Sequence, residues 1–418
     1  MNVQELLDTI EAEKLKVDFL HELTPPNKKL YEDKCGGKFE AVTQGKEKDI
    51  FLIPDVGTLH FLYRGQAKEV NPCVPTLYRG NPSAQEIFVE RMRLTVFRHF
   101  LYSHPVITKF FQKHNFFVDV EGLAQHYGLK TSVLDLTSSL DVALFFAMCP
   151  YDSKIDSYTY HDDDKEHEAI LYVFNPLLNN ESYPSIRSFL QKKITPIGLQ
   201  AFPRPGVQKG FALHLDEGES IKSWLYRFTF TSADSKHYYN KFKCGTGLWV
   251  KDDIFVPKVK KIASLKKFSY KIFNETYKMY KPKGISATKL KKNLLDEKEF
   301  CVECNGLTFT VGEIKNIVKE WNTVHGKEVA LSIIRKSWEE PKTGLKSDFR
   351  SFSRISTRLM LNLIANPGPL DKAEWINHNK TSRVKQPSKS KDSGWIEYPE
   401  SLESLFGTNF LEEKDWLI

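Results

Sequence analysis

Residues 121–150, EGLAQHYGLKTSVLDLTSSLDVALFFAMCP, decide the fold. Within them TSVLDLT, residues 131–137, is rich in aliphatic and β-branched side chains, which predicts a strand. The residues that follow, SSLDVALFFAMC, carry apolar side chains at helical spacing and predict a buried helix. The apolar face of this helix is expected to contain Val142, Leu144, Phe145, Phe146 and Met148.

Three hydroxyl side chains, Thr137, Ser138 and Ser139, stand where this strand meets the helix. Any of them can cap the start of the helix, and Asp141 suits its first turn. The same geometry presents hydroxyls and unpaired backbone N–H groups that can receive a phosphate or a ribose. Capping and ligand binding are compatible, so the junction is a candidate binding site.

An arginine in FLYRGQ, residues 61–66, is the second candidate. The run before it is rich in Ile, Leu, Phe and Val and is interrupted by Pro54 and Gly57, which favours two short strands. Arg64 is expected where the second strand leaves the sheet. Gly65 next to it lets a ligand or another backbone approach closely. The alternative is that Arg64 pairs with a carboxylate at a sheet edge.

The composition is that of a globular protein with a sizeable core. The chain has 418 residues, of which 41% are hydrophobic and 13% aromatic, enough for two or three domains or one large domain with extensions. No apolar run approaches the roughly 18 residues that span a bilayer, and the N-terminus reads as an acidic amphipathic helix. We therefore expect a cytoplasmic protein without membrane contact, whose six cysteines are reduced.

The net charge of +7 is concentrated in residues 256–293, where aromatic side chains alternate with lysines. Lysines that neutralise phosphates and rings that stack on bases are typical of a groove for single-stranded nucleic acid. This segment is therefore a candidate contact for RNA or DNA. The alternative is a solvated lysine face whose rings point into the core. The rings are Phe268, Tyr270, Phe273, Tyr277 and Tyr280.

Four segments resemble the FRG domain in order and spacing. They are FLYRGQ, PCVPTLYRG with Arg79, the block from residue 124 to 147, and RPGVQKGFALH at residues 204–214. The resemblance covers about residues 56–230. The family usually has an arginine and a tryptophan where this chain has Ser132 and Leu136. If that arginine binds ligand in relatives, this protein must bind it otherwise.

The layout of these segments is similar to the ADP-ribosyltransferase fold. The resemblance implies an α+β protein with a split, mixed β-sheet core. Helical spacing predicts an N-terminal helix, and the pattern beyond about residue 285 predicts a mainly helical C-terminal region. We therefore expect a helical lead and loop at 1–55, the FRG domain at 56–285 and the helical region at 286–418.

The resemblance also implies NAD as a substrate and assigns roles to residues. Arg64 would hold the phosphate and ribose, and Thr137 or Ser138 would order the site. The implied catalytic residues are Arg64, Thr137 and Gln208, and the implied NAD contacts are Tyr63, Arg64, Gly65, Gln66, Arg79, Gln125, His126, Tyr127 and Ser138. His126 and Tyr127 would stack on nicotinamide, unless they are structural residues of a turn.

Gln208 stands where the transferases carry a late glutamate. Glutamine can hydrogen-bond a ribose hydroxyl, but it has no negative charge to stabilise a developing cation. Either catalysis relies on positioning, or a carboxylate comes from elsewhere. The candidates are Asp135, Glu217 and Glu219.

Two functions follow from these observations. One is an NAD-dependent ADP-ribosyltransferase, a toxin or anti-phage effector that modifies nucleic acid or protein, with an antitoxin or another protein at its C-terminal region. The other is a non-catalytic module that senses a nucleotide or binds a protein.

Two stretches contain residues that can bind metals, but no metal is expected at either of them. Cys301 and Cys304 have zinc-knuckle spacing, but only His325 follows them. The run HDDDKEHE at residues 161–168 reads as a solvated loop.

Overall fold

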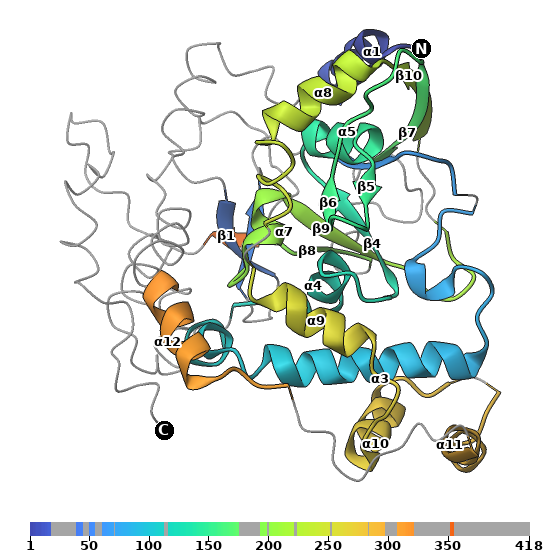
Figure 1. Cartoon of the computed structure of the whole chain (residues 1–418), viewed down its shortest axis with the longest axis vertical. Coiled ribbons are helices and arrows are strands. Elements are labelled where there is room, and N and C mark those ends of the chain that lie inside the picture. The colour runs from blue at the N-terminus through green and yellow to red at the C-terminus, as the bar shows by residue number, and fades with distance from the viewer. Residues whose placement is uncertain are drawn as a thin grey trace.

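A six-stranded antiparallel sheet forms the centre of the protein, in the order β10-β7-β3-β4-β9-β8 (Figure 1). Its strands are β3 (Leu62–Gln66), β4 (Val133–Thr137), β7 (His167–Phe174), β8 (Ile194–Pro196), β9 (Gly210–His214) and β10 (Trp224–Phe230). The computed structural model describes residues 1–17, 39–44, 50–54, 61–70, 72–112, 116–174, 193–198, 200–220, 224–250, 253–282, 284–296, 307–321 and 352–354.

The expectation of an α+β fold is confirmed, but the expectation of a mixed sheet is wrong. Every pairing between neighbouring strands of this sheet is antiparallel. A parallel pairing occurs only at an isolated bridge between Asn2 and Thr229, within the described residues.

The sheet is weakly joined at its middle. Strands β3 and β4 pair at one position, Tyr63 with Thr137, whereas β3 and β7 pair from Leu62 to Gln66 and β4 and β9 pair along all of β4. Beyond Tyr63 and Thr137 the two central strands diverge. Their backbone groups therefore lack ladder partners across the gap.

Two groups of helices cover one face of the sheet, one on each side of this gap. Helix α5 (Leu140–Met148) packs on β3 and β7, and α1 (Val3–Val17) and α8 (Ser232–Lys241) join it in the same core. Helices α4 (Val120–His126), α3 (Ala84–Leu101) and α9 (Phe255–Ala263) form the core beside β4. Figure 1 shows α1, α5 and α8 gathered at one end of the molecule and α3 at the other.

The predicted strand and helix of the deciding block are confirmed as β4 and α5. Ser139 is the residue that caps α5, because its hydroxyl accepts a hydrogen bond from the N–H of Val142. The predicted apolar face of α5 is buried except for Phe146, which is partly exposed.

The remaining elements are short. Strands β1 (Phe39–Gln44), β2 (Ile50–Pro54) and β11 (Phe352–Arg354) form a second sheet, and β5 (Tyr151–Asp152) pairs with β6 (Ser157–Tyr158). The helices are α7 (Pro203–Val207), α10 (Tyr270–Met279), α11 (Ala287–Asp296) and α12 (Val311–Glu320), with a 3-10 turn at Thr76–Tyr78 and a π-helical turn at Ile107–Phe111.

The described part of the C-terminal region is mainly helical, and it packs on α3. Leu290 and Leu294 of α11 share a core with Phe88 and Met92, and Ile317 of α12 lies in the core that contains Phe97. The boundaries at residues 55 and 285 stay predictions. In the described part of the chain, no helix has both the length and the apolar character needed to cross a bilayer.

A buried carboxylate fixes α4 beside the sheet. Asp119 caps α4 by accepting from the N–H of Gly122 at 2.8 Å, and it also contacts Thr195 and His214, the latter with Nε2 at 3.3 Å. Burial tends to lower the pKa of His214, but the hydrogen bond and charge of Asp119 outweigh it and raise that pKa. The same pair holds the pKa of Asp119 low despite burial.

We expect this pair to make stability depend on pH. Because the folded pKa of His214 is raised, its contribution is complete below the unfolded pKa of about 6.5 and is lost as pH rises through the folded pKa. The difference in free energy of unfolding between wild type and His214→Gln should therefore shrink as the pH is raised above about 6.5. Urea unfolding measures it, with His237→Gln, an exposed histidine, as the control. A constant difference would show that folding does not raise the pKa of His214.

Candidate functional site

A cavity of about 300 Å³ lies where β3 and β4 diverge. Its walls come from residues 63–65 of β3, residues 135–137 of β4, one side of α5, the end of α4, the end of β6 with Tyr158, and loops that carry Gln208 and Trp249. This volume is at the lower end of the range for small-molecule sites, roughly 300–1,000 Å³. The structure thus brings together segments that lie far apart in the sequence.

Arg64 spans the gap between the diverging strands. Its Nη1 donates a hydrogen bond of 2.9 Å to the backbone carbonyl of Asp135, which has no strand partner on that side. The sequence offered pairing with a carboxylate at a sheet edge as the alternative for Arg64, whereas in the structure Arg64 bonds to a backbone oxygen. The Nε of Arg64 is buried and has no hydrogen-bond partner among the described residues.

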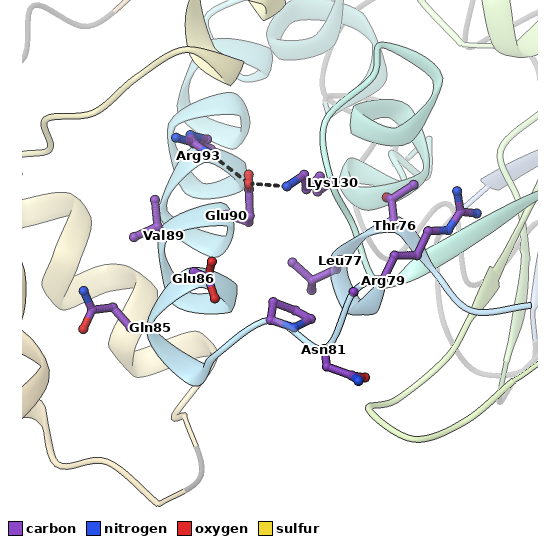
Figure 2. A pocket seen from close by; sticks show the side chains of 12 residues that line it. Thr76, Leu77, Arg79, Asn81, Gln85, Glu86, Val89, Glu90, Arg93 and Lys130 are labelled. Atoms are coloured by element: carbon purple, nitrogen blue, oxygen red, sulfur yellow. Dashed lines mark ion pairs between the residues drawn. The ribbon is translucent and has the colours of Figure 1, made fainter. Parts of the chain in front are cut away.

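Arg79 brings a second positive charge close to Arg64. Partial burial and the charge of Arg64 lower the pKa of Arg79. Figure 2 shows its side chain pointing away from Glu90, and its Nε donates to the carbonyl of Val74 at 3.2 Å. Neither guanidinium forms an ion pair within the described part of the chain. Two neighbouring guanidinium groups of this kind suit an anion such as a diphosphate.

Gly65 lets α5 approach the sheet. A Cβ at this position would lie 1.8 Å from the carbonyl oxygen of Ala143. The sequence suggested that Gly65 allows either a ligand or another backbone to approach closely, and the structure shows the approach of another backbone. Gly65 also lines the cavity.

Thr137 is held by hydrogen bonds within the protein. Its hydroxyl donates to the carbonyl of Gln208 at 2.7 Å and accepts from the N–H of Ser139 at 3.0 Å. The N–H of Ser138 donates to the carbonyl of Lys209 at 3.3 Å. Thr137 lines the cavity, and Ser138 is not part of its lining.

Gln208 orients His126. Its side-chain Nε2 donates to the carbonyl of Leu248 at 2.9 Å, so its Oε1 is the acceptor that faces Nδ1 of His126 at 2.9 Å. The proton of a neutral His126 therefore sits on Nδ1, and Nε2 is an acceptor that is buried and unpartnered among the described residues. Both residues line the cavity, but the amide of Gln208 is already engaged.

Three of the expected NAD contacts face different surroundings. Tyr127 lies in the core, where its hydroxyl donates to Asp253 and its ring packs against Phe255. Gln125 lines the cavity, and its Oε1 accepts from the hydroxyls of Thr76 and Thr131, which leaves its amide nitrogen as the donor. Gln66 is outside the lining.

Of the three candidate carboxylates, Asp135 lines the cavity. Its Oδ1 is buried and has no hydrogen-bond partner among the described residues. Glu219 pairs with Lys193 at 2.6 Å, and Glu217 is exposed in a turn. Asp135 is therefore the carboxylate that could act on a ligand beside Arg64.

An aromatic wall, formed by Phe146, Tyr158 and Trp249, was missed by sequence reasoning. The ring centroids of Phe146 and Tyr158 are 5.4 Å apart, and those of Tyr158 and Trp249 are 5.5 Å apart. The guanidinium of Arg204 lies 3.9 Å from the Trp249 ring centroid and holds that ring in place. No periodicity connects these residues, because Phe146 lies in α5, Tyr158 in the two-residue strand β6 and Trp249 in a loop.

The lysine-rich segment 256–293 matches the alternative more closely than the nucleic-acid groove. Phe268 and Phe273 are buried against α3, and Tyr280 is half-buried and bonds to Glu121. Tyr270 is exposed, with the ammonium of Lys291 4.4 Å from its ring centroid. Most of the rings are thus unavailable for stacking on bases.

A second cavity of about 340 Å³ lies between α3 and the 3-10 turn (Figure 2). Its central charges neutralise each other, because Glu90 pairs with Arg93 at 2.8 Å and with Lys130 at 3.3 Å. Glu86 is engaged in the capping box of α3 with Ser83. Arg79 also lines this cavity, and it is the cation of the lining that has no ion pair among the described residues.

Residues 59–155 match the FRG domain family, which confirms the resemblance for that part of the chain. The match covers β3, α3, α4, β4 and α5. No curated protein matches the chain, and no solved structure does. The resemblance to ADP-ribosyltransferases stays a prediction.

The residues with zinc-knuckle spacing, Cys301, Cys304 and His325, lie outside the described residues.

Proposed function

We propose that the cavity between β3 and β4 binds NAD and that the protein transfers ADP-ribose to a nucleic-acid or protein acceptor, acting as a toxin or anti-phage effector. The observation that carries the proposal is the charge arrangement at this cavity. Arg64 lines this cavity together with the unpartnered carboxylate oxygen of Asp135, and Arg79, which lines the second cavity, lies close enough to Arg64 for the charge of Arg64 to lower its pKa. Opposite charges at separate points suit a ligand with a diphosphate and a developing positive charge.

The roles follow from this arrangement. Arg64 and Arg79 would bind the diphosphate, and the aromatic wall would stack on the nicotinamide ring. As the bond between the ribose C1′ and the nicotinamide nitrogen breaks, nicotinamide would leave with the bonding electron pair. Asp135 would stabilise the cationic ribose that remains, and the acceptor would attack C1′ and lose a proton to solvent.

His126 would bind a ribose hydroxyl. Its Nε2 is the unpartnered acceptor, and Gln208 keeps the proton on Nδ1. In this account Gln208 is a positioning residue, because both ends of its amide bond to the protein.

A second candidate is a non-catalytic module that senses a nucleotide or a partner protein through the same cavity. The observation that favours it is the engaged amide of Gln208, which leaves the late position of the transferase pattern without a charged group. In this case NAD or a related nucleotide would bind and remain intact.

The test is incubation of the purified protein with NAD labelled on the adenylate and with separate pools of RNA, DNA and protein. We expect label in one pool, and a loss of about 100-fold or more with Arg64→Ala. Arg64→Ala also removes the hydrogen bond to the Asp135 carbonyl, which joins β3 to β4. Arg79→Ala is the matched variant, because it removes a guanidinium that bonds only to the nearby Val74 carbonyl among the described residues. Binding without transfer would support the second candidate, and a fully active Arg64→Ala protein would contradict the first.

A further inference from the structure

The start of β7 and the loop before it bring together two histidines and an aspartate. His161, Asp163 and His167 place one ligand atom each within 4.8 Å of one another. The Nε2 of His167 lies 2.7 Å from Oδ1 of Asp163, and the ring centroids of the two histidines are 3.8 Å apart. We call these three residues the His-Asp-His cluster.

The cluster is held in place from outside. The N–H of His161 donates to the hydroxyl of Ser235 at 3.2 Å, and the N–H of Asp163 donates to the hydroxyl of Ser232 at 3.3 Å. Both serines belong to α8. These bonds fix the loop to the start of α8, so the three side chains need little ordering when a ligand binds.

Aromatic packing fixes the two imidazole rings. The centroid of Phe230, at the end of β10, lies 5.5 Å from that of His161 and 5.4 Å from that of His167. The N–H of Lys165 also donates to Oδ1 of Asp163 at 3.3 Å. Supporting contacts of this kind orient the ligands of metal sites.

The charge around the cluster favours a cation. Residues 161–168 contain five carboxylates and one lysine. The hydrogen bond between Asp163 and His167 does not involve the second imidazole, whose ring centroid lies 3.8 Å from that of His167. A metal ion accounts for both, because it binds neutral imidazole nitrogens and a carboxylate oxygen together.

We propose that the His-Asp-His cluster binds Zn²⁺ or a similar divalent transition metal. Imidazole and carboxylate ligands suit zinc, and three protein ligands leave a fourth position for water. Such a metal clamps the loop between β6 and β7 onto α8 and takes no part in the reaction proposed above. The sequence favoured a solvated loop here because the aspartates dominate the run, whereas the histidines at its two ends complete the cluster.

The test is metal binding by the full chain after treatment with a chelator, followed by titration with Zn²⁺ in a calorimeter and with Co²⁺ in a spectrophotometer. We expect one site per chain and an affinity at least about tenfold lower in His161→Ala and in His167→Ala. His237→Ala, an exposed histidine on α8, and Cys304→Ser should bind as the wild type does.

Thermal unfolding separates loss of the site from loss of the fold. Zn²⁺ should raise the melting temperature of the wild type and leave that of folded His161→Ala and His167→Ala unchanged. Equal Zn²⁺ affinity in the wild type and both histidine variants would overturn the proposal. So would a site that Cys304→Ser removes, or no binding by the wild type.

Discussion

Gly65→Ala is expected to lower the free energy of unfolding by about 4 kcal/mol or more, or to prevent folding. The new Cβ would lie 1.8 Å from the Ala143 carbonyl oxygen and 3.0 Å from the Cβ of Ala147. The first obstacle is backbone inside α5, so it cannot rotate away as a flexible side chain would. Strand β3 would have to separate from α5, which would disturb the core that surrounds both.

Urea unfolding or thermal unfolding measures this effect, and Gly312→Ala is the matched control. Gly312 lies near the start of α12, and a Cβ there meets nothing within 4 Å. Alanine favours a helix over glycine by about 1 kcal/mol, so this control should be neutral or slightly more stable. A Gly65→Ala protein as stable as the wild type would show that α5 does not approach β3 this closely.

Asp135→Asn is expected to lower the rate of nicotinamide release by about 100-fold or more while the affinity for NAD changes little. Asparagine has the same shape as aspartate, and Oδ1 has no hydrogen-bond partner to lose among the described residues. The substitution therefore removes the negative charge with little effect on the fold. The measurement pairs the initial rate of nicotinamide release with calorimetric NAD binding.

Two further variants sharpen this prediction. Glu217→Gln removes an exposed carboxylate outside the cavity and should have no effect. Gln208→Glu should not raise activity, because the new carboxylate would face the Leu248 carbonyl that now accepts a hydrogen bond. If Gln208→Glu increases turnover and Asp135→Asn leaves it unchanged, the carboxylate acts from position 208 and not from Asp135.

Local patterns predicted the elements that carry the cavity. The strand and helix of residues 131–149 are β4 and α5, because aliphatic content and helical spacing are properties of a short window. Arg64, Thr137, Gln208 and His126, chosen from sequence, all line one cavity.

Features that depend on the tertiary structure did not follow from sequence. Whether Arg64 meets a carboxylate or a backbone carbonyl depends on the divergence of β3 and β4, which no local pattern records. Tyr127 adjoins His126, but it turns into the core because Asp253, more than a hundred residues later, accepts its hydroxyl. The same limit hid Trp249, which reaches the cavity from a loop.

The measurement that tests the central claim most directly is nicotinamide release from NAD by the purified wild type, with Arg64→Lys beside it. Lysine keeps the positive charge but loses the planar pair of donors that suits both the diphosphate and the Asp135 carbonyl. The account predicts steady release by the wild type and a loss of about tenfold or more in Arg64→Lys at equal folded content. Release at the same rate in both proteins, or NAD that stays intact with the wild type and every acceptor pool, would contradict it.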